Sequence, residues 1–149
     1  MLQRDFDSTG NIKEFAVWAA DFMDNLPVGM YRVTLEGELV FCNWSFARQL
    51  GYNAPAKLQD FKVVELFPHK SERGKFVRQV IDHGSVRRYP MQLRRKSGDL
   101  FTCSTTARAV VNDDGQVTYI DGVMHESMSQ DGSSWSRASS SGEQDSRDV

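Results

Sequence analysis

Few residues of this chain have the types and spacing that catalysis or metal binding requires. His69, His83 and His125 are far apart, and no cysteine or carboxylate spacing completes a zinc site around them. No nucleophile–base–acid set and no glycine-rich phosphate loop is recognisable. Cys42 and Cys103 lie in apolar, strand-like runs, which favours reduced core thiols; a disulfide would require neighbouring strands. These residues predict a domain that is neither an enzyme nor a metal protein.

The size and composition of the chain are those of an ordinary globular domain. Its 149 residues are enough to bury one hydrophobic core, and its net charge of −2 argues against a dedicated nucleic-acid binder. No apolar run approaches the ~18 residues that span a bilayer, and the N-terminus is too charged for a secretory signal. We therefore expect a soluble, cytoplasmic module.

The N-terminal segment predicts an amphipathic helix. Residues 1–10 are expected to be a flexible lead-in, and residues 11–26 have apolar side chains at helical spacing. Asn11 is the expected N-cap and Pro27 ends the helix. We expect this helix to cap the predicted sheet and to contribute to a homodimer. The residues expected at that interface are Phe15, Trp18, Ala19, Phe22 and Met23.

The rest of the chain alternates between strand and helix patterns. Strands are predicted over residues 30–34 and 38–42, then a short helix over 43–50, two helical turns, and a longer helix between Pro68 and Gly84. Three further strands follow over residues 86–96, 100–111 and 117–126. Helix, two strands, short helices and three strands make an α+β domain. The serine-rich residues 127–149 are expected to be disordered.

This order of elements resembles the PAS (sensory box) domain over residues 27–126. The matching stretches are "LPVGMYRVTLEGELVFCN", "FARQLGY", "LFPHKSERGKF", "LRRKSGDLF" and "VVNDDGQVTYIDGVMHE". The resemblance implies a PAS fold, with a five-stranded antiparallel sheet and short helices inserted between strands 2 and 3. PAS domains are sensory and dimerisation modules of histidine kinases, cyclases and transcription regulators. The implied function is therefore regulation within a signal-transduction protein, by small-ligand binding, dimerisation or both, with a downstream domain or partner protein.

The resemblance leaves the cofactor unknown and makes none obligatory. Light-sensing members carry a Gly-x-Asn-Cys-Arg-Phe-Leu-Gln motif, which this chain lacks. Haem-binding members use a histidine within the long inserted helix, whereas His69 and His83 stand at the two ends of that helix. A haem- or flavin-binding redox or gas sensor remains the alternative function.

An apolar pocket between the sheet and the inserted helices is the implied ligand site, unless side chains fill it. Asn43 either binds a ligand or caps the following helix, and capping is favoured. The candidate lining residues are Tyr31, Phe41, Asn43, Phe46, Leu66, Phe76, Val80, Met91, Leu93, Phe101, Cys103, Thr105 and Ile120.

Two further stretches have open interpretations. The triplet His125–Glu126–Ser127 stands where PAS domains usually carry Asp-Ile-Thr, and no heptad pattern follows it. Signalling through a downstream coiled coil is therefore in doubt. Basic residues cluster within positions 87–96, either as a solvated strand edge, which is favoured, or as a site for an acidic partner.

Overall fold

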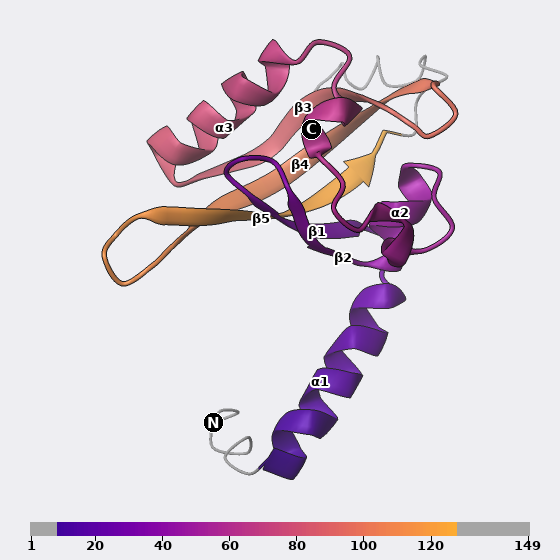
Figure 1. Cartoon of the computed structure of the whole chain (residues 1–149), viewed down its shortest axis with the longest axis vertical. Coiled ribbons are helices and arrows are strands. Elements are labelled where there is room, and N and C mark those ends of the chain that lie inside the picture. Colours follow the sequence, from indigo (N-terminus) through magenta and orange to yellow (C-terminus); the bar gives the residue numbers. More distant parts are fainter. Residues whose placement is uncertain (1–8, 128–149) are drawn as a thin grey trace, which may run out of the picture.

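One antiparallel sheet in the order β2-β1-β5-β4-β3 organises the part of the chain that the structure describes, residues 9–127 of a computed structural model (Figure 1). The strands are β1 (Gly29–Thr34), β2 (Leu39–Cys42), β3 (Ser85–Arg94), β4 (Leu100–Val111) and β5 (Val117–Glu126). The first hairpin and the C-terminal three-stranded meander join through the β1–β5 pairing. The prediction of one continuous five-stranded sheet is confirmed.

The segment between β2 and β3 forms short helices that cover one face of the sheet, which we call the inner face (Figure 1). These elements are α2 (Trp44–Gln49), the 3₁₀ turns η2 (Pro55–Leu58) and η3 (Val63–Leu66), and α3 (Ser71–His83). Gly84 ends α3 in the left-handed conformation, at a φ of 83° that favours glycine. The predicted α+β class and the inserted helices are confirmed.

The core lies between the inner face and these helices. Strand β4 shows the underlying period of two: Phe101, Cys103, Thr105 and Ala107 are buried, and the residues between them are exposed or half-buried. Val80 of α3 and Leu50 after α2 are fully buried against this layer. Pro90 lies in β3, an edge strand, as its missing N–H predicts.

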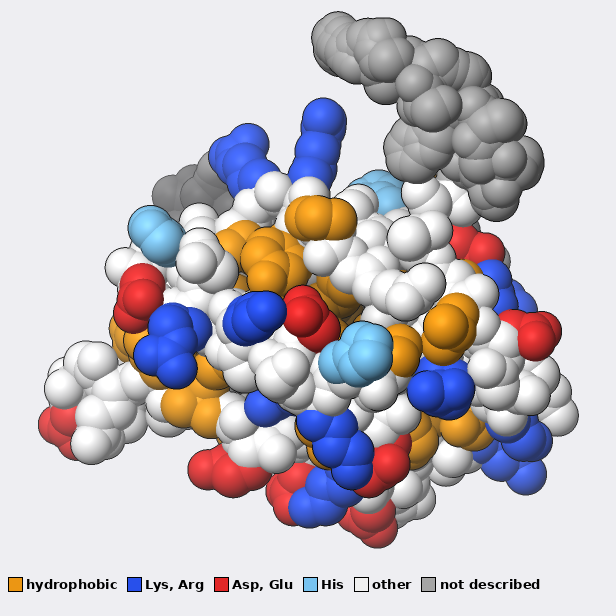
Figure 2. Space-filling view, turned by 90° about the horizontal axis from the view of Figure 1, so that it is seen from above, with side chains coloured by type: hydrophobic (Ala, Val, Ile, Leu, Met, Phe, Trp, Pro, Cys, Tyr) orange, Lys and Arg blue, Asp and Glu red, His pale blue; other side chains and the backbone are white. Residues whose placement is uncertain are grey.

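No helix of the described chain covers the other face of the sheet, which we call the outer face (Figure 1). The side chains on this face are both charged and apolar. Arg32 of β1 forms a two-pronged ion pair there with Asp121 of β5, at 2.7 and 2.9 Å. Seen from the end opposite α1 (Thr9–Asp24), side chains of both charges are interspersed among hydrophobic ones (Figure 2).

Helix α1 extends away from the sheet, so the prediction that it caps the sheet is wrong for this chain (Figure 1). Two hydrogen bonds at its C-terminal end set its direction. The Asn43 side-chain amide donates to the Met23 carbonyl at 2.6 Å, and the Trp44 N–H donates to the Asp24 carboxylate at 3.2 Å. These contacts join α1 to the start of α2, beside the β1–β2 hairpin.

The bounds of α1 also differ from the prediction, because the helix begins at Thr9 rather than Asn11 and ends at Asp24 rather than residue 26. The predicted lead-in covers residues 1–10, of which 1–8 lie outside the described residues and the last two belong to α1. Of the predicted tail at 127–149, residues 128–149 lie outside the described residues. The N–H of Ser127 still donates to the Thr102 carbonyl and extends the β4–β5 pairing. Within residues 9–127, no helix is long and apolar enough to cross a membrane.

Candidate functional site

A small apolar cavity of about 40 Å³ lies between the inner face of the sheet and the helices η3 and α3. One wall comes from β1, β3, β4 and β5, and the other from α2, η3 and α3. Its lining residues are Tyr31, Val33, Phe46, Val63, Leu66, Phe67, Arg73, Phe76, Met91, Leu93, Thr105 and Met124. On the usual measure, this volume holds about three water molecules, so the core is nearly full.

The polar corner of this cavity is a chain of two hydrogen bonds across the sheet. The Thr105 hydroxyl donates to the Val123 carbonyl at 2.8 Å and accepts from the Tyr31 hydroxyl at 2.6 Å. Because the Thr105 proton is used in the first bond, the Tyr31 proton must make the second. Burial raises the pKa of Tyr31, so the phenol stays protonated and remains a donor.

Arg73 is a charged group at the rim of this otherwise apolar cavity. Its guanidinium donates to the Thr34 and Leu35 carbonyls, at 3.3 and 3.2 Å, in the turn after β1. Burial lowers the pKa of Arg73, but an arginine remains charged at any physiological pH. The two carbonyls partly replace the water that the guanidinium loses, and they tie α3 to the β1–β2 hairpin.

Seven of the thirteen predicted pocket residues line the cavity together: Tyr31, Phe46, Leu66, Phe76, Met91, Leu93 and Thr105. Four others, Val80, Phe101, Cys103 and Ile120, are buried in the surrounding core without lining it. Their side chains pack against other core residues, which is the core-filling alternative that the sequence left open.

The remaining two candidates do not face the cavity. Phe41 is 45% exposed and lies on the outer face, because its strand neighbour Cys42 is the residue that points into the core. Asn43 is buried, and its amide is fully used by the backbone. Its oxygen accepts from the N–H groups of Met30 and Phe46, and its nitrogen donates to the carbonyls of Met23 and Val28. Asn43 is therefore the N-cap of α2 and has no atom left for a ligand.

Five lining residues were not predicted: Val33, Val63, Phe67, Arg73 and Met124. Val33 follows Tyr31 at strand period, so alternation places both side chains on one face. Arg73 precedes Phe76 by three positions and Val77 by four, so helical spacing places it on the buried stripe of α3. The strand period that places Val33 and the helical spacing that places Arg73 could both have been found in the sequence.

The two cysteines are free, buried thiols on strands that are not neighbours, since β1 and β5 separate β2 from β4. Burial raises the pKa of Cys42 to about 11 and that of Cys103 to about 12. At neutral pH both are protonated, and a protonated, buried thiol is a poor nucleophile.

The buried thiol of Cys103 should make folding sensitive to alkali. The unfolded thiol ionises near pH 8.5 and the folded one near 12, so the stability is complete below pH 8.5 and is lost as the pH rises. Between pH 8 and 10.5 we expect Cys103 to account for a loss of about 2.5 kcal/mol in the free energy of unfolding. Urea unfolding at pH 8 and at pH 10.5 should show a smaller fall in the free energy of unfolding for Cys103→Ala than for the wild type. An equal fall in the two proteins would contradict the role given to the Cys103 thiol.

The residues predicted for the N-terminal interface form an exposed stripe on α1, which we call the aromatic stripe. The rings of Phe15 and Trp18 are 5.8 Å apart, and those of Trp18 and Phe22 stack at 5.4 Å. Trp18 is 58% and Phe22 50% exposed. Ala19 and Met23 are partly buried beside them.

The described residues offer no group of three or more His, Cys, Asp or Glu that would hold a metal ion. A haem or flavin does not fit the interior either, because such ligands need pockets of roughly 300–1,000 Å³. His69 and His83 are both exposed, and His83 shares a hydrogen bond of 3.1 Å with the Gln79 carbonyl. Neither histidine lines the cavity.

The described chain is thus an α+β domain in which one five-stranded antiparallel sheet is closed on one face by short helices, around a small apolar cavity. A family model described as "PAS domain" matches residues 27–126. The chain therefore belongs to the PAS family, whose members are sensory modules of signalling proteins.

Solved structures agree with this assignment. A PAS domain from Colwellia psychrerythraea is 14% identical, with a TM-score of 0.64 over 76% of this chain and 97% of that one. A PAS domain of a two-component sensor histidine kinase is 11% identical, with a TM-score of 0.64 over 77% and 98%. The PAS domain of a LuxR-family transcriptional regulator from Burkholderia thailandensis, in complex with ethanol, is 22% identical, with a TM-score of 0.57 over 71% and 94%. A search of curated proteins found no match.

Proposed function

We propose that this chain is a regulatory PAS module that acts by self-association through α1, and that it passes its signal to a partner domain or protein, as in a histidine kinase or cyclase. The observation that carries the proposal is the exposure of Trp18 and Phe22, which are both half or more exposed. Within residues 9–127, the helix that bears them is hydrogen-bonded to the domain near its C-terminal end and extends away from the sheet (Figure 1). Adjacent exposed aromatic side chains of this kind mark an interaction surface.

The length of α1 supports the same conclusion. A helix of 16 residues is only marginally stable in water by itself, and most helices in proteins depend on burial of their apolar face. A second copy of the chain would bury the aromatic stripe of both helices at once. Self-association therefore accounts for both the exposed stripe and the stability of the helix.

Phe22→Glu should convert the dimer to a monomer. A carboxylate in the centre of the apolar contact would have to be desolvated in both copies, so we expect the dimer dissociation constant to rise at least tenfold. Light scattering coupled to size-exclusion chromatography distinguishes a 16.9-kDa chain from a dimer of about twice that mass.

The matched control is Val17→Glu, because Val17 is 70% exposed and lies on the other side of the same helix. The control should remain dimeric. A wild-type chain that is monomeric at 100 μM, roughly a typical assay concentration for weak dimers, would reject the proposal, and so would a Phe22→Glu dimer of unchanged affinity.

A second candidate function is the binding of a very small amphiphile in the inner cavity. The analogy is the similar PAS domain from Burkholderia thailandensis, whose structure is a complex with ethanol. The cavity has room for a molecule of two or three heavy atoms and has hydroxyl groups at Tyr31 and Thr105. Titration with ethanol, followed by NMR, should give saturable shifts confined to the amides around the cavity. Thr105→Val keeps the side-chain shape and should weaken binding, whereas linear shifts spread over the whole surface would count against this function.

A further inference from the structure

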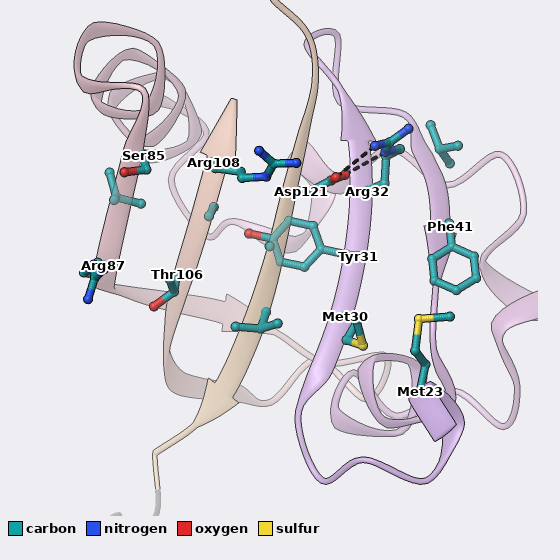
Figure 3. A pocket seen from close by; sticks show the side chains of 15 residues that line it. Met23, Met30, Tyr31, Arg32, Phe41, Ser85, Arg87, Thr106, Arg108 and Asp121 are labelled. Carbon is teal, nitrogen blue, oxygen red and sulfur yellow. Dashed lines mark hydrogen bonds and ion pairs between the residues drawn. The ribbon is translucent and has the colours of Figure 1, made fainter. Parts of the chain in front are cut away.

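The outer face of the sheet has a shallow hollow with a volume of about 890 Å³, far larger than the inner cavity of about 40 Å³ (Figure 3). Its lining residues come from all five strands, and among the described helices only α1 contributes one, Met23. A volume of this size is within the usual range for the binding of a small organic molecule. The two ends of the hollow differ in chemistry, and this difference indicates what kind of molecule it fits.

One row of side chains across the middle strands of the hollow is apolar. Met30 of β1 lies opposite Val123 of β5 in the strand register, so the two side chains are neighbours on the outer face. We call these two residues the apolar row. Beyond β1, the hollow ends at Phe41 of β2 and at Met23, and Phe41 is close to half exposed (Figure 3). An apolar chain along this row would therefore remove several apolar side chains from water.

At its β4–β3 end, the hollow is lined by hydrogen-bond donors. Thr106 of β4 continues the apolar row, since it lies opposite Val123. The Thr106 hydroxyl oxygen accepts from the N–H of Arg88 at 3.1 Å, so its own proton remains to be donated. Arg87 lies across from Thr106 on β3, and Arg108 lies two residues along β4 (Figure 3). Within residues 9–127, neither Arg87 nor Arg108 takes part in an ion pair.

The acidic side chain that lines the hollow, Asp121, is already used. Its two carboxylate oxygens accept from the Arg32 guanidinium, at 2.7 and 2.9 Å. The lining therefore has three arginines against one aspartate, and its net charge is positive. The arginines that lack an ion pair, Arg87 and Arg108, are both at the β4–β3 end, so this end is complementary to an anion.

We propose that this hollow binds a free, single-chain amphiphile with a carboxylate head, of the fatty-acid class. The carboxylate accepts a hydrogen bond from the Thr106 hydroxyl and pairs with the guanidinium groups of Arg87 and Arg108, while the tail lies along the apolar row. The site is on the opposite face of the sheet from the inner cavity. It does not depend on the self-association proposed above, because Trp18 and Phe22 do not line the hollow.

The geometry of the sheet sets the length of the tail. From a head group at Thr106, the tail crosses Val123 and Met30 and ends beside Phe41. Three strand spacings separate β4 from β2, or ~14 Å, which is about the length of an extended chain of ten to twelve carbons. Because the hollow is shallow, the tail keeps one side in water, and each methylene should add only about a factor of two to the affinity.

Titration of the full chain with dodecanoate below its micellar concentration, followed by NMR, tests the site. We expect saturable shifts at the amides of Met30, Thr106 and Val123. Hexanoate has the same head and a shorter tail, and it should bind roughly tenfold or more weakly. Dodecyltrimethylammonium has the same tail and a positive head, and it should also bind roughly tenfold or more weakly, because it meets the two arginines.

Arg87→Ala with Arg108→Ala removes the two cations and should weaken the binding of dodecanoate roughly tenfold or more. The matched control is Lys57→Ala with Arg78→Ala, because both of these residues are exposed on η2 and α3 and neither lines the hollow. The control should bind as the wild type does. So should Phe22→Glu, whose effect is expected on the dimer alone, so the site and the proposed self-association can fail separately.

Three results would overturn the inference. The first is a set of dodecanoate shifts confined to the amides of Leu66 and Phe76, which would place the ligand in the inner cavity. The second is equal affinity for dodecanoate and dodecyltrimethylammonium, or for the wild type and the double arginine variant. The third is binding to phosphatidylglycerol vesicles without a response to free dodecanoate, because the ligand would then be a membrane surface.

Discussion

Replacement of Asn43 with leucine is expected to lower the free energy of unfolding by about 3–5 kcal/mol. The Asn43 amide satisfies four backbone groups: the N–H groups of Met30 and Phe46, and the carbonyls of Met23 and Val28. Leucine has a similar size but no polar atom, so these groups would lose their partner in a site that water reaches poorly. Urea unfolding of the two proteins measures the difference.

Asn43→Asp separates the two halves of this network. A carboxylate still accepts from the N–H groups of Met30 and Phe46, so the cap of α2 is kept, but it faces two carbonyl oxygens that it cannot bind. We expect the free energy of unfolding of Asn43→Asp to lie between those of the wild type and Asn43→Leu. We also expect faster proteolysis in residues 24–28, because one of the two hydrogen bonds that hold the end of α1 is lost. If Asn43→Leu cost less than about 1 kcal/mol, Asn43 would not be the organising residue that its hydrogen bonds indicate.

The sequence predicts the elements of this fold well because their signals are local. The period of two in β4 and the helical spacing of α3 depend only on which side chains face the core. The capping role of Asn43 is local too, since the Phe46 N–H that it accepts from is three residues away. Its bonds to Met23 and Val28 are not local, and no sequence pattern marks them.

Phe41 shows where strand periodicity fails. Leu39 and Cys42 both lie toward the core although three positions separate them, because the register of β1 and β2 shifts between Arg32 and Val33. An irregularity of this kind adds one residue to one strand and reverses the side on which the following side chains lie. A single sequence that reads "LVFC" gives no indication of where the shift occurs.

The sequence predicts the aromatic stripe and the inner cavity only in part, for a different reason. The spacing of Phe15, Trp18 and Phe22 predicts an apolar helical face, but a pattern along one helix does not specify which surface covers it. For the same reason, apolar lining residues predict a core and not its free volume. The cavity of about 40 Å³ depends on how closely Tyr31, Phe46 and their neighbours pack.

Gly122→Ala should be strongly destabilising because Tyr31 occupies the space that a side chain would need. Gly122 lies in β5 between Tyr31 of β1 and Ala107 of β4, and a Cβ atom there would overlap the Tyr31 ring and hydroxyl. The Tyr31 side chain would have to move. This movement would break the hydrogen bond from its hydroxyl to Thr105 and the contact of its ring with the Phe46 ring, whose centroid is 5.4 Å from that of Tyr31. We expect a loss of about 2–4 kcal/mol in the free energy of unfolding.

Gly74→Ala is the matched control, because a Cβ atom at this position of α3 meets nothing within 4 Å. In a helix interior, the same change should stabilise the protein by about 1 kcal/mol. The double variant Gly122→Ala with Tyr31→Leu tests the cause, because a smaller side chain at position 31 removes the overlap. Its loss should be clearly less than the sum of the two single losses. Strictly additive losses would mean that the close approach of Tyr31 to Gly122 does not determine how the inner cavity is packed.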